Sequence, residues 1–456
     1  MHSPPEVPRD RFFAPPPPLL AMPRAGAIAR LARPGAGINH VLAYGQSLSS
    51  GWDGWPALTT TPEPGVLMLG GCVRPMDEAV PGWRPVGDAV LRPLVARLQR
   101  PGIGHLLDEA GPQGGAMGET VLETALREFR RRAGLDAAQR LLGSSCGVGA
   151  QTIAALSHGA APNLFGRMEA CATLARQVAD EQYRVAALLF LQGEHDSRGF
   201  ADGEAGREAY LARLLRLHDD FQARVVAGIA RQDAPAAMFI HQTGGDYASD
   251  TLGVAQAQLD AALTVPTVFL AAPVYPVPSR GGHLDANGYR WIGAQFGKVM
   301  HRVLAQGRDW RPLHPLRALA CGRLVHVDFH VPAPPLAFGL PFHGATQAAV
   351  PEQGFAVTDD AGPVPIAEVV LDGARSLRIV LERPAGKGAR LRYAAAGRHA
   401  GRGGLHDSDP DEAGAMFVDL PGAPPSALAG RPYGLANWCV AFTMPLPGGD
   451  IPPSAR

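Results

Sequence analysis

Short apolar runs alternate with longer amphipathic segments from residue 41 to about residue 305. The run at 184–191 is almost continuously apolar, which is typical of a strand that is covered on both faces. The segment 119–132 has its apolar residues at helical spacing, and Asp285 is placed to cap a final helix. This alternation predicts a parallel sheet with helices on both of its faces. The expected strands end near residues 43, 143, 191, 241 and 271, and the expected helices span 119–132, 164–180, 204–229 and 286–304.

The pattern changes after about residue 308. Residues 311–317 contain two prolines and are expected to form a linker. Beyond them, short alternating segments are separated by Gly and Pro about every ten residues, a texture typical of a small β-sandwich. The expected strands are 324–330, 354–358, 367–371, 376–381, 389–394 and 438–442. We therefore expect an α/β domain at 36–307 and a β-rich domain at 318–456, preceded by a disordered, proline-rich arm at 1–35.

Composition narrows the classes of function. Lys+Arg and Asp+Glu both number 42, so a formal net charge of zero gives no general attraction to nucleic acid. No apolar run is long enough to span a membrane. The N-terminus does not resemble a secretory signal, so a cytoplasmic location is the default expectation. The sequence does not fix the oligomeric state.

Metal and cofactor motifs are missing from the sequence. The five cysteines have no CxxC spacing, and neither a dinucleotide fingerprint nor a phosphate-binding loop occurs. No His/Asp cluster has the spacing of metal ligands. The sequence therefore predicts neither a metal nor a cofactor.

Four polar loops follow the expected strands of the α/β part. In a parallel sheet, all four lie at the same edge, where such folds place their chemistry. They are Gly45-Gln46-Ser47, the Gly/Ser-rich stretch 143–153, 192–196 (Gln-Gly-Glu-His-Asp), and 281–289 around His283.

Together these loops contain the parts that acyl transfer by a serine requires. Ser47 is the candidate nucleophile and His283 the candidate base, with Glu194 or Asp196 orienting the histidine. Each residue also has a plain structural interpretation. Ser47 could belong to a turn, His283 could be an ordinary loop residue, and a buried Glu194 could form a structural ion pair. It is their joint placement after successive strands that favours a serine hydrolase.

A serine hydrolase also needs hydrogen-bond donors for the oxyanion and residues that contact the substrate. The expected donors are the backbone N–H groups of Ser47 and Gly149 and the side chain of Gln192. Trp52 could stack on a sugar face or cover the sheet edge. The other expected substrate contacts are Gln46, Asp196 and Gln242.

These four blocks resemble those of the SGNH (GDSL-like) hydrolases. Within that superfamily they are most similar to the blocks of the sialate O-acetylesterase and acetylxylan esterase branch. The resemblance spans roughly residues 38–305 and rests chiefly on Gly45-Gln46-Ser47 followed by Gln192-Gly193-Glu194. It implies a three-layer α/β/α fold, metal-free ester hydrolysis by double displacement, and in many cases an acetylated carbohydrate as substrate. The same branch supports Glu194 as the orienting acid.

One position departs from the family pattern. Members usually carry an aspartate three residues before the histidine, and here that position is Arg280. Three interpretations stay open: Glu194 completes the triad, the chain works as a Ser-His dyad, or it has lost activity. We expect the first, and hence a small-acyl carbohydrate esterase. The alternative is a weak or inactive glycan-binding module with the same fold.

Overall fold

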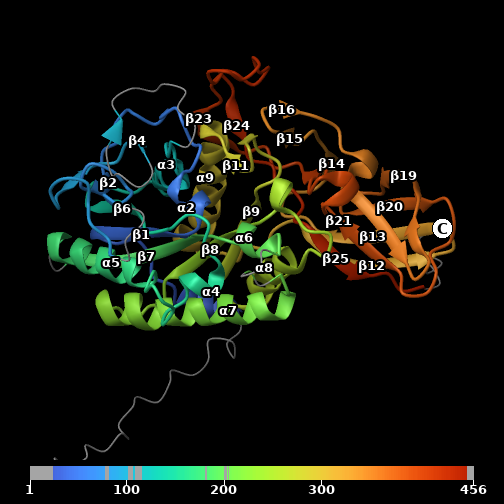
Figure 1. Cartoon of the computed structure of the whole chain (residues 1–456), viewed down its shortest axis with the longest axis horizontal. Helices are drawn as coiled ribbons and strands as arrows, with labels where there is room; N and C mark the ends of the chain where they lie inside the picture. The colour runs from blue at the N-terminus through green and yellow to red at the C-terminus, as the bar shows by residue number, and fades with distance from the viewer. Residues whose placement is uncertain are drawn as a thin grey trace, which may run out of the picture.

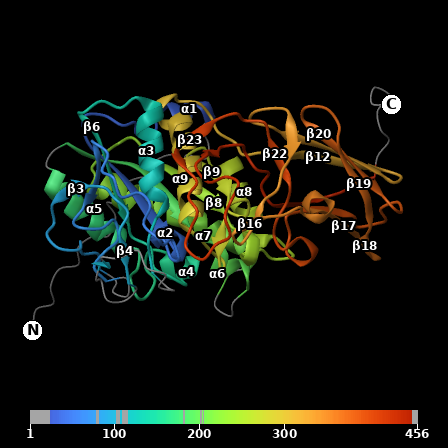
Figure 2. The same cartoon turned by 90° about the horizontal axis from the view of Figure 1, so that it is seen from above.

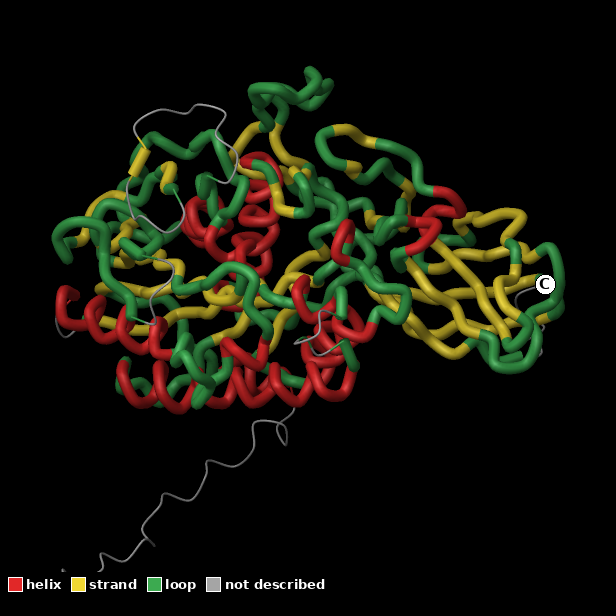
Figure 3. Tube along the Cα trace, in the orientation of Figure 1, coloured by secondary structure: helices red, strands yellow, loops and turns green. Residues whose placement is uncertain are grey.

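The structure is a computed structural model, and it describes residues 24–77, 82–100, 106–107, 116–179, 182–199, 203 and 205–448. It has an α/β part and a β-rich part that lie side by side (Figures 1 and 2). Helices are concentrated in the first part, whereas the second consists almost entirely of strands and loops (Figure 3). The expected fold class, α/β followed by all-β, is therefore confirmed.

A seven-stranded sheet forms the centre of the α/β part, in the order β3-β2-β6-β1-β7-β8-β9. All neighbours are parallel except β2 and β3. Both faces are covered, so the strands of its centre are apolar on each side. The strands are β1 (Gly37–Gly45), β2 (Val66–Leu69), β3 (Leu91–Pro93), β6 (Gln139–Ser145), β7 (Tyr183–Leu191), β8 (Ala237–Gln242) and β9 (Val268–Pro273).

Helices cover the sheet as two layers (Figure 1). One apolar cluster joins the sheet to α5 (Gly166–Ala179), α7 (Arg207–Asp220) and α8 (Gly253–Thr264), and a second joins its other face to α3 (Val121–Ala133) and α9 (Ala286–Met300). The expected helix at 204–229 is α7 continued by a π-helical segment, η2 (Phe221–Ile229), and α9 continues in the same way as η4 (His301–Ala305). Asp285 caps α9 as expected, accepting a hydrogen bond from the Gly288 N–H at 2.8 Å.

Two boundary expectations were wrong. Part of the predicted arm is ordered, because α1 (Arg24–Ala29) packs Ile28 against the sheet layer and Arg24 binds Asp309 at 2.6 Å. The predicted linker is largely a strand, since β12 (His314–Cys321) begins within it. Residues 1–23, with the proline run at 15–18, lie outside the described residues.

The β-rich part contains two four-stranded antiparallel sheets, β12-β13-β20-β19 and β18-β17-β21-β25. Their inward residues share one apolar cluster, in which Phe329 of the first sheet meets Phe442 of the second. The sandwich expectation therefore holds. The strands are β13 (Leu324–His330), β17 (Phe355–Asp359), β18 (Gly362–Val364), β19 (Ile366–Leu371), β20 (Ser376–Leu381), β21 (Arg390–Tyr393) and β25 (Phe442–Pro445).

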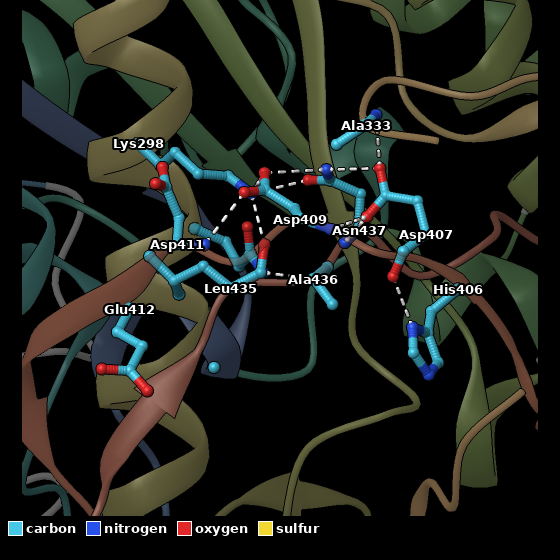
Figure 4. A network of polar contacts seen from close by, with 12 residues as sticks. Lys298, Ala333, His406, Asp407, Asp409, Asp411, Glu412, Leu435, Ala436 and Asn437 are labelled. Atoms are coloured by element: carbon cyan, nitrogen blue, oxygen red, sulfur yellow. Dashed lines mark hydrogen bonds and ion pairs between the residues drawn. The ribbon is translucent and has the colours of Figure 1, made fainter. Parts of the chain in front are cut away.

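A buried lysine connects the two parts (Figure 4). Lys298 of α9 is only 6% exposed, and its ammonium donates to the carbonyl of Leu435, to Asn437 Oδ1 at 2.7 Å and to Asp409 Oδ2 at 3.2 Å. Asn437 in turn binds Asp407 Oδ2 at 2.8 Å. The Lys298 ammonium thus compensates the Asp409 carboxylate directly and is connected to Asp407 through Asn437.

None of the helices in the described part of the chain combines the length and the apolar character that crossing a membrane requires.

Candidate active site

The loops predicted to carry chemistry meet at one edge of the sheet. The register pairs Ala43 with Ser145 and Gly45 with Leu191, so β1, β6 and β7 end side by side. Ser47 follows the central strand, β1, directly. The parallel pairing therefore brings the serine to the edge of the sheet where the other predicted loops begin.

Gly45 makes the turn that places Ser47. Its φ is +138°, and a Cβ there would lie 2.0 Å from the Leu191 carbonyl oxygen, so no other residue fits. The chain then enters the short helix α2 (Ser47–Ser50), whose N-cap residue, Gln46, makes no side-chain capping bond. Ser47 is thus the first residue of a short helix that follows strand β1.

His283 faces this serine from a separate hairpin. The strands β10 (Ser279–Arg280) and β11 (His283–Leu284) are joined by Gly281 and Gly282, which both have positive φ, as a tight two-residue turn requires. The Nε2 atom of His283 lies 2.9 Å from Ser47 Oγ. The structure thus brings together the predicted nucleophile and the predicted base.

Asp53 is the carboxylate that accompanies this histidine. Its Oδ2 atom lies 2.8 Å from His283 Nδ1, and both side chains are 20% exposed. A carboxylate there accepts a hydrogen from Nδ1 and so leaves the Nε2 lone pair directed at Ser47 Oγ. The arrangement Ser-His-Asp can therefore pass a proton from the serine to the ring.

The sequence expectation that Glu194 orients His283 is contradicted by this geometry. Glu194 is 1% exposed at the start of α6 (Glu194–Ser197), and its Oε1 lies 2.6 Å from Nε2 of His241, at the end of the neighbouring strand β8. Burial alone would raise the pKa of Glu194, but its pairing with His241 holds that pKa below the ordinary value. Glu194 therefore pairs with His241, whereas the carboxylate that pairs with His283 is Asp53.

The hydrogen bonds of Asp196 and Gln192 also go to groups other than those predicted from the sequence. Asp196 Oδ2 accepts from the Ile153 N–H at 2.9 Å and from the Gln192 amide, and neither side chain is exposed. The Gln192 amide nitrogen also faces Gln46 Oε1 at 3.3 Å and the Gln151 carbonyl at 3.2 Å. Its two hydrogens already have three acceptors, so Gln192 does not serve as an oxyanion donor.

Gln242 does not line the site either. It is fully buried and binds the Ala441 backbone through both amide atoms, which connects β8 to the β-rich part. Gln46 is 4% exposed, and its Oε1 accepts from the His195 N–H at 3.2 Å. The amide of Gln242 is therefore used in holding the two parts together, and the Gln46 side chain oxygen is used by the loop that begins at Gln192.

Trp52 lies beside His283, and the loop before Gly149 lies beside α2. The Trp52 ring is half-buried, with its centroid 6.1 Å from that of His283. The loop before Gly149 packs on α2, because Gly147 is in contact with Ser49 and the Val148 N–H donates to the Gly45 carbonyl at 3.0 Å.

Sequence reasoning missed Asp53 for an identifiable reason. The residue lies only six positions after Ser47, in a Gly-rich turn, and has φ +59°. An aspartate between Trp52 and Gly54 has the composition of any tight turn. One signal was available in the sequence. Because the usual aspartate before His283 is missing, another carboxylate close to the serine in the sequence was a candidate for the acid.

Comparison with solved structures identifies the fold. A carbohydrate acetylesterase from Xanthomonas citri superposes with a TM-score of 0.55 at 14% identity, over 89% of this chain and 80% of that chain. The two proteins share a fold. Because the α/β part spans only about residues 37–305, the match must extend into the β-rich part as well.

Two further structures are less similar to the chain. A protein from Arabidopsis thaliana has a TM-score of 0.41 at 17% identity, over 57% of this chain and 97% of that one. A carbohydrate acetylesterase family member from Sinorhizobium meliloti has a TM-score of 0.31 at 15% identity, over 58% and 99%. No protein-family model matches the sequence, and no curated protein matches it.

The described residues include no group of three or more His, Cys, Asp or Glu side chains that could hold a metal ion.

Proposed function

We propose that this protein is a serine ester hydrolase that removes acetyl or other small acyl groups from a carbohydrate. The observation that carries the proposal is the continuous chain from Ser47 Oγ to His283 Nε2 at 2.9 Å and from His283 Nδ1 to Asp53 Oδ2 at 2.8 Å. The fold shared with a carbohydrate acetylesterase supports the substrate class. The half-buried Trp52 beside His283 offers a flat face for a sugar ring.

The reaction proceeds by double displacement. Ser47 Oγ attacks the acyl carbon while its proton passes to His283 Nε2, and Asp53 stabilises the imidazolium that forms. The protonated ring then gives this proton to the departing sugar oxygen, which leaves an acyl-serine. Water repeats the sequence and releases the carboxylic acid. The backbone N–H groups of Ser47 and Gly149 are the donors we assign to the oxyanion.

A carboxylate at His283 also bears on the rival interpretation. An inactive glycan-binding module was favoured only by the missing aspartate at position 280. Because Asp53 offers an acceptor to the same ring atom, that reason no longer applies.

The test is hydrolysis of p-nitrophenyl acetate by the wild type, Ser47→Ala, Asp53→Asn and Asp285→Asn. We expect Ser47→Ala to abolish turnover and Asp53→Asn to lower kcat by about 10²- to 10⁴-fold, because an amide stabilises the wrong histidine tautomer. Asp285→Asn is the control, since Asn also caps helices well. Equally slow hydrolysis by the wild type and by Ser47→Ala would refute the proposal that the protein is a serine esterase.

Two extensions test the substrate. Activity should fall as the acyl chain of the p-nitrophenyl ester lengthens from acetyl to octanoyl. Acetate should be released from acetylated oligosaccharides by the wild type and not by Ser47→Ala.

A further inference from the structure

Arg280 stands where the resembling family has its acid, and its side chain points to the loop that carries Asp53. Its Cα pairs with that of His283 across the β10–β11 hairpin, so the two residues lie directly opposite each other. Opposed residues in an antiparallel pair project to the same side of the hairpin. Arg280 and His283 therefore approach the same loop together.

The contacts of Arg280 are specific to this loop. Its Nη1 atom donates to the Asp53 carbonyl at 3.1 Å and to the Trp55 carbonyl at 3.0 Å. The guanidinium carbon lies 3.5 Å from the centroid of the Trp55 ring, a stacked cation–π arrangement. One half-buried side chain thus holds the backbone on both sides of Gly54.

The Asp53 backbone needs such support. Its φ of +59° is in the left-handed region, which costs energy for a residue with a Cβ. Gly54 is held from the other side, because its carbonyl accepts from the Glu119 N–H at 2.7 Å. The direction of the Asp53 carboxylate depends on the conformation of this peptide segment. Arg280 binds the segment at the carbonyl of Asp53 itself.

We propose that Arg280 is a positioning residue that holds the Asp53 carboxylate against His283, so that one hairpin supplies the base and fixes its acid. The inference rests on the proposed function, because it assigns Arg280 a role in the same Ser-His-Asp site. An arginine is suited to it, because its Nη1 group donates to both carbonyls while the guanidinium plane lies over the Trp55 ring, and a lysine ammonium has no such plane.

The test measures p-nitrophenyl acetate kinetics for Arg280→Met, Asp53→Asn and the double variant. Met keeps an apolar stem over Trp55 and removes the donors. We expect Arg280→Met to lower kcat by about 10- to 100-fold with little change in KM, because a misplaced acid disturbs the transition state more than binding. In the Asp53→Asn background the same change should cost less than about threefold. Losses that multiply would overturn the proposal.

Arg302→Met is the matched control. Arg302 makes the same two kinds of contact far from the site, donating to the Asp309 carbonyl at 2.8 Å and lying 5.9 Å from the Trp310 ring. Its kcat should equal that of the wild type, although its stability falls. Arg280→Lys should recover only part of the lost kcat, and full recovery would refute the role of the guanidinium plane over Trp55.

A crystal structure of Arg280→Met separates this inference from the proposed function. We expect the Asp53 Oδ2 to His283 Nδ1 distance to exceed hydrogen-bonding range, and a retained distance near 2.8 Å would overturn the inference even if the enzyme is active. A wild type no faster than Ser47→Ala would refute the proposed function instead, while the same crystal structure would still decide the geometry.

Discussion

Two fully buried carboxylates of this molecule have pKa values that are shifted in opposite directions. Glu194 is buried beside His241, and the pairing lowers its pKa. Glu119 is equally buried, but its Oε1 accepts only from the backbone N–H groups of Leu58 and Thr59. Burial, with the nearby Glu123 carboxylate adding to it, raises the pKa of Glu119 to about 7. Glu194 is thus ionised for structural reasons, whereas Glu119 retains its proton well above the ordinary range.

The shift at Glu119 predicts a pH effect on stability. Its pKa is raised from 4.5 to about 7 on folding, so between these values the folded state binds more protons than the unfolded state. The free energy of unfolding should therefore fall as pH rises from about 4.5 to 7. Glu119→Gln should remove this fall and raise the melting temperature at pH 8 relative to the wild type. Thermal unfolding at pH 5 and pH 8 measures it.

The control for this prediction is Glu382→Gln, at an exposed position of the β-rich part. It should leave the pH dependence of the wild type intact. A Glu119→Gln protein that melts below the wild type at pH 8 would show that the buried carboxylate is ionised and needed.

At the scale of elements, the hairpin of β10 and β11 decides the geometry of the site. Its turn residues, Gly281 and Gly282, have φ +59° and +97°, but their surroundings differ. A Cβ on Gly281 would meet nothing within 4 Å, whereas one on Gly282 would lie 2.7 Å from Cε2 of Tyr247. Tyr247 belongs to the short η3 helix (Gly245–Tyr247), which therefore limits where His283 can lie.

This difference predicts separate effects for two neighbouring substitutions. Gly281→Ala and Gly282→Ala should each lower stability by about 1 kcal/mol, because both force a Cβ into the left-handed region. Only Gly282→Ala should also lower kcat/KM, by about tenfold or more, since the hairpin must move away from Tyr247 and take His283 with it. Kinetics and thermal melts of both variants check this. Equal kinetic losses would contradict it.

Elements were predictable from the sequence where a periodic pattern fixes them. The almost continuous apolar run at 184–191 predicted a strand that is covered on both faces, and β7 is that strand. The strands β2 and β3 were missed because β2 has four residues and β3 has three, too few for a period to emerge. Parallel pairing then placed Ser47 correctly. The acid could not be assigned in this way, because whether a turn carboxylate reaches a histidine 230 positions later depends on how the hairpin packs.

At the scale of the whole molecule, Lys298 joins α9 to the β-rich part. Burial lowers its pKa, and Asp409 opposes that effect. Two of its three acceptors, the Leu435 carbonyl and Asn437 Oδ1, are buried with it, and Asp409 is half-buried, so removal of the ammonium would leave these groups unpaired. The α/β part is thus held to its neighbour by a buried polar network as well as by apolar contacts.

Lys298→Met should therefore destabilise the protein strongly. We expect a loss of about 2–4 kcal/mol in the free energy of unfolding, because removing the ammonium leaves two buried acceptors and a half-buried carboxylate unpaired. The control is Lys387→Met, at an exposed position. Urea unfolding of both variants measures the effect. Equal midpoints for the two variants would show that apolar packing can replace the ammonium at no cost.

These two lysines are the only ones in the sequence, where arginine supplies the remaining basic side chains. Lys387 is open to any amine-reactive reagent, whereas Lys298 is shielded for as long as α9 and the β-rich part stay together. The chain thus contains an intrinsic chemical reporter. The ratio of acylated Lys298 to acylated Lys387, read by peptide mass spectrometry, records how often the two halves separate in solution.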